Sequence, residues 1–166
     1  GLQGELGILD VKSSQPATEI LSILGLDPSW FPSPMAAGSP IGYITPSVAQ
    51  RTGLHPKTPV TLAGPDAHSG LLGMGVVRPG QVGIVAGWSS PVQMVTERPV
   101  FDRMRRTWTE LHITPNTWVL ESSPGDTGNS YDRVRSLVAP NADHDELHRL
   151  ANRAPLGSMG VTAFLG

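Results

Sequence analysis

One acidic residue, Asp66, stands in the run LAGPDAHSG (62–70), after an apolar stretch and between small residues. A general base must lie at the end of a rigid element, open to a cleft, within reach of a substrate hydroxyl. The carboxyl end of a buried strand offers such a place. The structural alternative is a helix cap, since an Asp between a strand and a helix accepts hydrogen bonds from free backbone N–H groups. The two roles are compatible, and the local sequence leaves both open.

A second candidate is AGWSSP (86–91), which places a glycine and two hydroxyls after an expected strand. Backbone N–H groups and hydroxyls in such a turn can hold a phosphate oxyanion. A serine-hydrolase elbow, G-x-S-x-G with Ser89 as nucleophile, fits poorly because Pro91 stands at the second glycine and a strand-like segment follows. A plain hairpin turn is the structural alternative.

Other motifs give weaker signals. The run GLLGMG (70–75) has the wrong spacing for G-x-G-x-x-G, and no Walker-type G-K-[ST] occurs. His144 and His148 are four residues apart with acids beside them, so metal ligation is conceivable. A solvated helix face is the simpler interpretation. Three tryptophans are most simply core or strand-face aromatics: Trp88, Trp108 and Trp118.

Local signals predict the elements that position these residues. Apolar spacing predicts a short helix over 16–26. A second helix has Thr45 as its cap, Pro46 at its first position and Gly53 at its end. The run TPVTLAG (58–64) predicts a buried strand.

The helix expected over 66–77 is rich in small residues, which would allow another backbone to approach it closely. The turn VRPGQ (77–81) is the best candidate for a domain boundary. Four strands joined by short turns are then expected, followed by a glycine-flanked loop and two helices. Their ranges are 81–88, 90–99, 106–114 and 117–123 for the strands, and 129–139 and 143–154 for the helices.

Composition limits the classes of function. The chain has 166 residues, enough for one domain or for pieces of two. Its net charge of 12 − 14 = −2 gives no footprint for nucleic acid or an anionic membrane. No cysteine is present, which excludes disulfides, Cys-type zinc sites and thiol nucleophiles. Without a membrane-span run or a signal peptide, and with the apolar run VTAFLG at its end, we expect a segment of a longer, cytoplasmic chain.

In their order along the chain, these motifs resemble the FGGY carbohydrate kinases, the family of xylulokinase, glycerol kinase and autoinducer-2 kinase. The resemblance runs through 41–90, 121–137 and 150–166, and 17–32 looks like the family's preceding segment. No single motif is decisive, and the order tGL…tPV…G-x-D-x-x-x-G…G-x-G…pGq…G-x-S carries the resemblance.

The resemblance implies an α/β fold of the actin-like ATPase, ribonuclease H-like type, present in part and covering the junction of two domains. Residues 1–78 would form the C-terminal part of the first, sugar-binding domain. Residues 79–166 would form the N-terminal part of the second, nucleotide-binding domain. The implied activity is ATP-dependent phosphorylation of a small-molecule sugar or polyol, with Mg²⁺, and a homodimer is compatible with it.

The same resemblance implies the roles of individual residues. Asp66 would be the base that takes the proton from the acceptor hydroxyl, and an indirect Mg²⁺ contact is compatible with that place. Gly87 with Ser89 or Ser90 would face the ATP phosphates.

Two further residues would lie on the nucleoside side. Gly128 would lie near the nucleoside, and Asp132, one turn on, would face the adenosine.

Three residues depart from the family pattern: Pro65 before the acid, Trp88 in place of a threonine, and Arg133 in place of an aromatic. They place the chain in a divergent branch, nearest autoinducer-2 kinase or xylulokinase. They are also compatible with an alternative function, that of a kinase-like protein that binds a sugar or nucleotide without turnover. Because the family's first phosphate loop and its late adenosine motif are missing from the sequence, we expect the 166 residues alone to be inactive.

Overall fold

The computed structural model describes residues 2–162. The chain divides into two compact units. The first unit comprises Gly1–Gly83 and Gln93–Glu121, and the second comprises Ile84–Val92 and Ser122–Gly166. Helices and strands alternate along much of the chain, so the expected α/β class is observed. The division into domains at residues 78 and 79 stays a prediction.

The first unit begins with a series of short elements. These are α1 (Leu2–Glu5), β1 (Leu9–Asp10), β2 (Gln15–Pro16), α2 (Thr18–Ile23) and a 3-10 turn over Pro28–Trp30. The helix predicted over 16–26 is confirmed as α2, whose Leu21 is fully buried. The indole N–H of Trp118 donates to the carbonyl of Val11 over 2.6 Å and ties this segment to β8.

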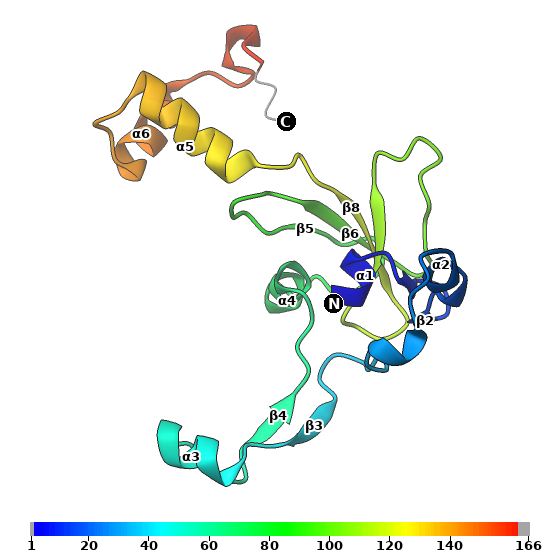
Figure 1. The fold of residues 1–166 in the computed structure, drawn as a ribbon. Helices are drawn as coiled ribbons and strands as arrows, with labels where there is room; N and C mark the ends of the chain where they lie inside the picture. Colours follow the sequence, from blue (N-terminus) through cyan, green and yellow to red (C-terminus); the bar gives the residue numbers. More distant parts are fainter. Residues whose placement is uncertain (1, 163–166) are drawn as a thin grey trace. The chain divides into compact units, whose positions relative to one another are not determined.

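Helix α3 (Pro46–Thr52) connects the antiparallel strands β3 (Pro40–Tyr43) and β4 (Pro59–Thr61) and lies beyond their paired ends, as Figure 1 shows. Both ends of helix α3 lie at the residues that the sequence predicts. The hydroxyl of Thr45 accepts from the N–H of Val48, and Gly53 ends the helix with a φ of 76°. A strand is present within 58–64 as predicted, but the prediction that it is buried is wrong. Strand β4 is exposed at two of its three residues because β3 is its one partner in a two-stranded sheet.

A four-stranded sheet forms the body of the first unit, in the order β5-β6-β8-β7. All four predicted strands are confirmed. They are β5 (Val82–Ile84), β6 (Val92–Thr96), β7 (Trp108–Leu111) and β8 (Trp118–Ser122). Strands β7 and β8 pair antiparallel, with Glu110 opposite Val119. Val95 and Val119 are buried.

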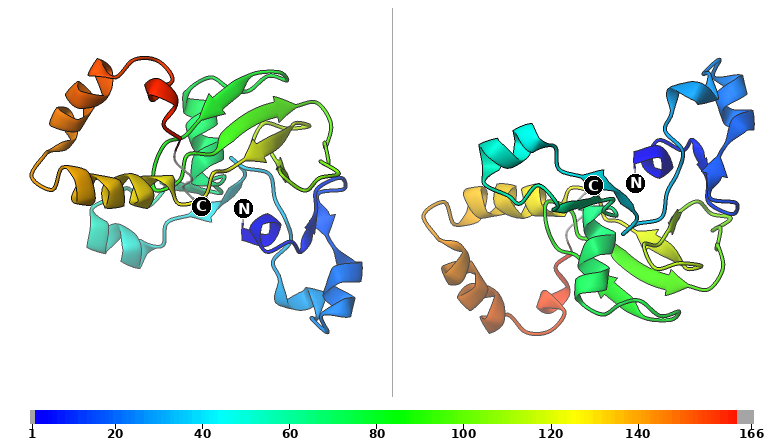
Figure 2. Two further views of the ribbon diagram at one scale, coloured as in Figure 1. Left: turned by 90° about the horizontal axis from the view of Figure 1, so that it is seen from above. Right: turned by 90° about the horizontal axis from the view of Figure 1, so that it is seen from below.

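Helix α4 (Asp66–Gly73) packs on this sheet (Figures 1 and 2). Gly83 on β5 makes the close approach possible, because a Cβ added there would lie 2.5 Å from Cδ2 of Leu71. The sequence placed the close approach on the helix's own small residues. That prediction is wrong for Gly73 and Gly75, which would have nothing within 4 Å of an added Cβ. Gly75 instead takes a φ of 74° just beyond the helix.

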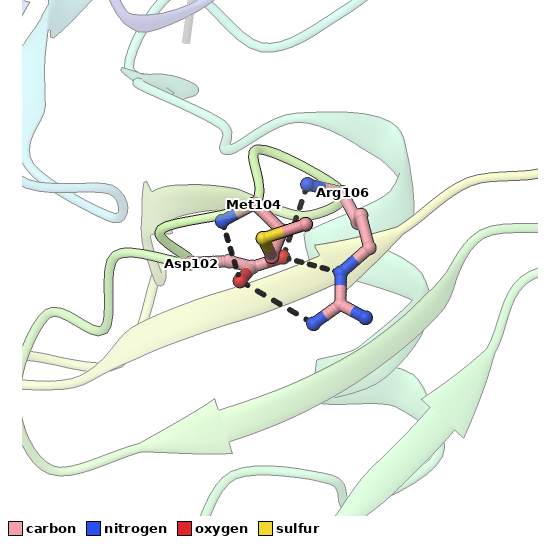
Figure 3. A network of polar contacts seen from close by, with 3 residues as sticks. All are labelled: Asp102, Met104 and Arg106. Carbon is pink, nitrogen blue, oxygen red and sulfur yellow. Dashed lines mark hydrogen bonds and ion pairs between the residues drawn. The ribbon is translucent and has the colours of Figure 1, made fainter.

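The loop between β6 and β7 is organised by one carboxylate (Figure 3). Asp102 accepts hydrogen bonds from the backbone N–H groups of Met104 and Arg106, each over 3.0 Å. The guanidinium of Arg106 adds a contact of 2.9 Å from Nε. These bonds hold the pKa of Asp102 at about 2, mainly through Arg106.

The second unit contains α5 (Thr127–Val138), α6 (His144–Arg153) and a 3-10 turn over Ser158–Gly160. Both predicted helices are confirmed. The ring of His144 stacks on Tyr131 at 5.8 Å between centroids. Within residues 2–162 no group of three or more His, Asp or Glu side chains is placed to hold a metal ion. Most of the predicted apolar run at the end, residues 163–166, lies outside the described residues.

The tryptophans differ in their surroundings. Trp108 and Trp118 lie on strands, as predicted, although Trp108 is 57% exposed. Trp88 lies in a loop and is 70% exposed, so a core or strand-face role is wrong for it. None of the helices in the described part of the chain has the length and apolarity needed to span a membrane.

Candidate active site

Asp66 is the first residue of α4, reached from β4 through a short loop, and its side chain is exposed. The capping interpretation needs correction by one position, because the cap residue is Pro65, which makes no side-chain cap bond. The Asp66 carboxylate nevertheless accepts the N–H of Ala67 through Oδ1 over 2.7 Å. An exposed carboxylate held at the start of a helix suits a base that meets its substrate from solution.

The opposite side of α4 carries a histidine that the sequence reasoning missed. His68 is 1% exposed. Its Nε2 lies 3.2 Å from Oε2 of Glu110 on β7, and the pair does not have the geometry of a regular hydrogen bond. The contact is therefore a close polar approach outside regular hydrogen-bond geometry. It lowers the pKa of Glu110, against the opposing effect of burial.

Further polar side chains surround this contact. The ring of His112 lies 5.7 Å from that of His68, and burial lowers its pKa. The amide of Gln93 donates to Glu121 over 2.8 Å. Burial and the nearby Glu110 raise the pKa of Glu121. The available sequence signal was the alternation of Glu110 and His112 on one strand, which places both on the same face of a sheet.

The expected phosphate turn, 86–91, connects β5 to β6 in the second unit. The N–H of Gly87 donates to the carbonyl of Ser89 over 2.7 Å, which closes the turn on itself. Ser89 and Ser90 are half-buried. Since a strand follows the turn, the strand–turn–helix context of a hydrolase elbow is absent at Ser89.

Gly128 lies directly against this turn, near the start of α5. Its N–H donates to the carbonyl of Trp88 over 2.6 Å. A Cβ added to it would lie 2.5 Å from the carbonyl oxygen of Gly87 and 2.7 Å from Cα of Trp88. The hydroxyl of Thr127 donates to that of Ser90 over 3.1 Å. Two segments far apart in sequence are thus joined by backbone contacts that only a glycine permits.

The remaining predicted residues have separate settings. Asp132 lies one turn beyond Gly128 on α5 and forms an ion pair of 3.4 Å with Arg135, and its side chain is 56% exposed. Asp66 belongs to the first unit, whereas the five residues expected at the nucleotide belong to the second. The structure brings together Gly87, Ser89, Ser90 and Gly128.

A hollow of about 430 Å³ lies in the first unit near α4. It is lined from the loop before the helix, from the helix and from the β7–β8 turn, by residues that include Gly64, Ser69, Leu72 and Ile113. Asp66 is not among its lining residues, and the lining is largely apolar. These features do not suit a polyhydroxylated substrate, so we assign no function to the hollow.

Comparison with characterised proteins relates the chain to sugar kinases. The model of the FGGY family of carbohydrate kinases, N-terminal domain, matches residues 2–73. The autoinducer-2 kinase of Photorhabdus laumondii is 30% identical over 170 residues, which cover 95% of this chain and 32% of that protein. The autoinducer-2 kinase of Enterobacter sp. is 31% identical with the same coverage. The chain therefore spans about a third of the length of these relatives.

Solved structures agree with the sequence comparisons. The xylulose kinase of Rhodospirillum rubrum superposes with a TM-score of 0.73 and 25% identity, over 91% of this chain and 31% of that one. The xylulose kinase of Lactobacillus acidophilus gives a TM-score of 0.76 at 19% identity, over 93% and 31%. The predicted actin-like ATPase fold, present in part, is confirmed. The chain belongs to the FGGY family of carbohydrate kinases.

Proposed function

We propose that the full-length protein carrying this sequence transfers the γ-phosphoryl group of ATP to a hydroxyl of a sugar or polyol. The observation that carries the proposal is the exposed carboxylate of Asp66 at the start of α4, at the acid position of the family's G-x-D pattern. Because the chain covers about a third of its relatives, the activity is assigned to the full-length protein. We expect no turnover from the 166 residues alone.

Phosphoryl transfer needs positioning, neutralisation of charge and an acceptor for the nucleophile's proton, with little covalent chemistry from the protein. Asp66 supplies the acceptor for that proton. Mg²⁺-ATP, when bound, supplies the phosphoryl group and neutralises its charge. The Mg²⁺ contact that we assign to Asp66 is indirect and leaves its carboxylate available as the base.

The turn over 86–91 is suited to phosphate oxygens. The N–H of Gly87 is engaged within the turn, so we assign the phosphate contacts to the hydroxyls of Ser89 and Ser90. This assignment is supported by Gly128, which packs so closely against the turn that any side chain there would collide with it. Asp132, exposed one turn further along α5, is assigned to the adenosine.

The candidate sites are also assigned to two different domains. We assign residues 1–78 to the sugar-binding domain and residues 79–166 to the nucleotide-binding domain. The match of the family's N-terminal model to residues 2–73 supports the first assignment.

A second candidate is a kinase-like protein that binds nucleotide or sugar without turnover. The observation that favours it is Trp88, which lies within the turn at the family's threonine position and is 70% exposed. A tryptophan has no hydroxyl to offer a phosphate oxygen. Binding of ATP in the absence of any turnover would support this candidate.

The test is ADP release by the full-length protein with Mg-ATP and a panel of ketoses, aldoses and polyols. We expect one class of acceptor to stimulate ADP release well above the rate with water alone. ADP release that no acceptor stimulates, together with measurable ATP binding in calorimetry, would contradict the kinase proposal and favour the second candidate.

A further inference from the structure

We propose that His68 is a positioning residue, whose buried contact with Glu110 fixes the rotation of α4 about its axis and so the direction in which Asp66 presents its carboxylate. This inference rests on the proposed function, in which Asp66 is the base. It concerns a contact between α4 and β7, both of which lie within the first unit.

The inner side of α4 is unusual in its chemistry. Its buried residues are His68 and Leu71, with exposures of 1% and 0%. A buried imidazole is costly unless it meets a polar partner, whereas an aliphatic side chain at this place would need none. The partner is Glu110, whose side chain is 35% exposed. The sequence thus places a polar contact where packing alone would suffice.

The sheet beneath the helix is polar in the same region. Glu110 and His112 alternate along one strand and its extension, so they share the face that meets α4. Glu121, two residues beyond the cross-strand partner of Glu110, lies on that face as well and is held by Gln93 on β6. These polar side chains lie close together beneath α4, and polar contacts in a low-dielectric interior fix one arrangement more strongly than aliphatic contacts do.

Helix geometry converts this contact into control of Asp66. Two residues along a helix correspond to a rotation of about 200°, so Asp66 and His68 lie on nearly opposite sides of α4. An oxygen near the outer radius of a helix, about 5–6 Å from the axis, moves by about 2 Å when the helix turns by about 20°. A misplacement of about 1 Å at a reacting group can cost about 10²-fold in rate.

Other restraints on the rotation of α4 are weaker. The helix has only eight residues, and its cap residue, Pro65, makes no side-chain bond. Leu71 packs against Gly83 of β5, but aliphatic packing tolerates small rotations better than a close polar contact does. The contact between His68 and Glu110 is therefore the one that we expect to set the angle.

The test uses variants of the full-length protein assayed for sugar-dependent ADP release. His68→Leu keeps the buried volume and removes the polar contact. His68→Gln keeps a donor at a comparable distance from the backbone. Glu110→Gln keeps the shape of the partner and removes its charge. Leu71→Val trims the same buried side of α4 without touching the contact and serves as the matched control.

We expect His68→Leu to lower kcat by about 10- to 100-fold while KM for ATP and for the sugar stays within about two-fold. His68→Gln should recover most of the lost kcat. Leu71→Val should lower the melting temperature and leave kcat unchanged. The double variant His68→Leu with Glu110→Gln should lose no more kcat than the more affected single variant, because both remove one contact.

Three results would overturn the inference: an unchanged kcat in folded His68→Leu, a His68→Gln variant no better than His68→Leu, or an equal kcat loss in Leu71→Val. If His68→Leu fails to fold, kcat is compared between Glu110→Gln and Leu71→Val. A kcat loss in Glu110→Gln alone would support the inference, and equal kcat values in the two variants would overturn it.

Failure of the proposed kinase function can be distinguished from failure of the positioning role of His68. If the wild-type protein phosphorylates no acceptor, the kinase proposal fails, and amide hydrogen exchange of Ala67 to Gly70 tests the positioning instead. Faster exchange in His68→Leu, restored by His68→Gln, would support fixation of the helix. Equal exchange in the wild-type protein and in both variants would overturn it.

Discussion

The N–H of Gly128 donates to the carbonyl of Trp88 over 2.6 Å, which joins the start of α5 to the turn after β5. The contact depends on the missing side chain, because a Cβ at residue 128 would lie 2.5 Å from the carbonyl oxygen of Gly87. Backbone atoms cannot yield as a flexible side chain can. The identity of residue 128 therefore determines whether the two segments can meet.

Gly128→Ala is expected to push the turn away from α5 and weaken ATP binding by at least about ten-fold, with a stability loss of about 1–3 kcal/mol from overpacking. Calorimetric titration with ATP and thermal unfolding of the full-length protein would measure both effects. Gly73→Ala is the matched control, because a Cβ there would have nothing within 4 Å. It should leave ATP binding unchanged. Equal ATP affinity in the two variants would contradict the assignment of this contact to the nucleotide site.

A second glycine fixes the loop that leads into Asp66. A Cβ on Gly64 would collide with Cγ2 of Ile113, whose β-branched side chain has little freedom to move aside. Gly64→Ala should therefore lower the free energy of unfolding by about 1–3 kcal/mol. Adding Ile113→Ala should recover part of that loss by opening space. Denaturant unfolding of both variants and of Ile113→Ala alone would measure the coupling, and strictly additive losses would show that the collision is relieved elsewhere.

The β6–β7 loop should resist acid. Hydrogen bonds from Arg106 and the backbone lower the pKa of Asp102 from 3.8 to about 2. Since the pKa is lower in the folded state, the stabilisation is present above the unfolded value and is lost as pH falls from about 4 through about 2. Carboxyl-carbon NMR titration would measure this pKa directly. Arg106→Gln should return it toward 3.8, and an unchanged midpoint would contradict the assigned cause.

The sequence predicts correctly those parts of the fold that depend on neighbouring residues. The helix bounded by Thr45, Pro46 and Gly53 was predicted to the residue, because its cap hydroxyl, its fixed φ and its left-handed end are all local properties. The four strands of the larger sheet were found for a similar reason, through runs of β-branched and aromatic residues.

Burial and long-range contact were not predictable in the same way. The strand over Pro59–Thr61 has an apolar sequence but is exposed, since its surroundings depend on which strands join its sheet. The contact of His68 with Glu110 joins α4 to β7, and no local pattern links the two. The proximity of Gly128 to the turn likewise follows from the tertiary fold, and before the structure it could be inferred only through the resemblance to a family.

The role of Asp66 as the base is tested by the substitution Asp66→Asn. The substitution keeps the shape of the side chain and an oxygen for the N–H of Ala67, but removes the group that accepts the proton. Initial rates of ADP formation should be compared at saturating Mg-ATP and sugar, with thermal unfolding and ATP binding measured on the same samples. If Asp66 is the base, kcat falls by about 10²- to 10⁴-fold while folding and ATP affinity stay unchanged. A folded Asp66→Asn protein that retains the wild-type kcat would contradict that role.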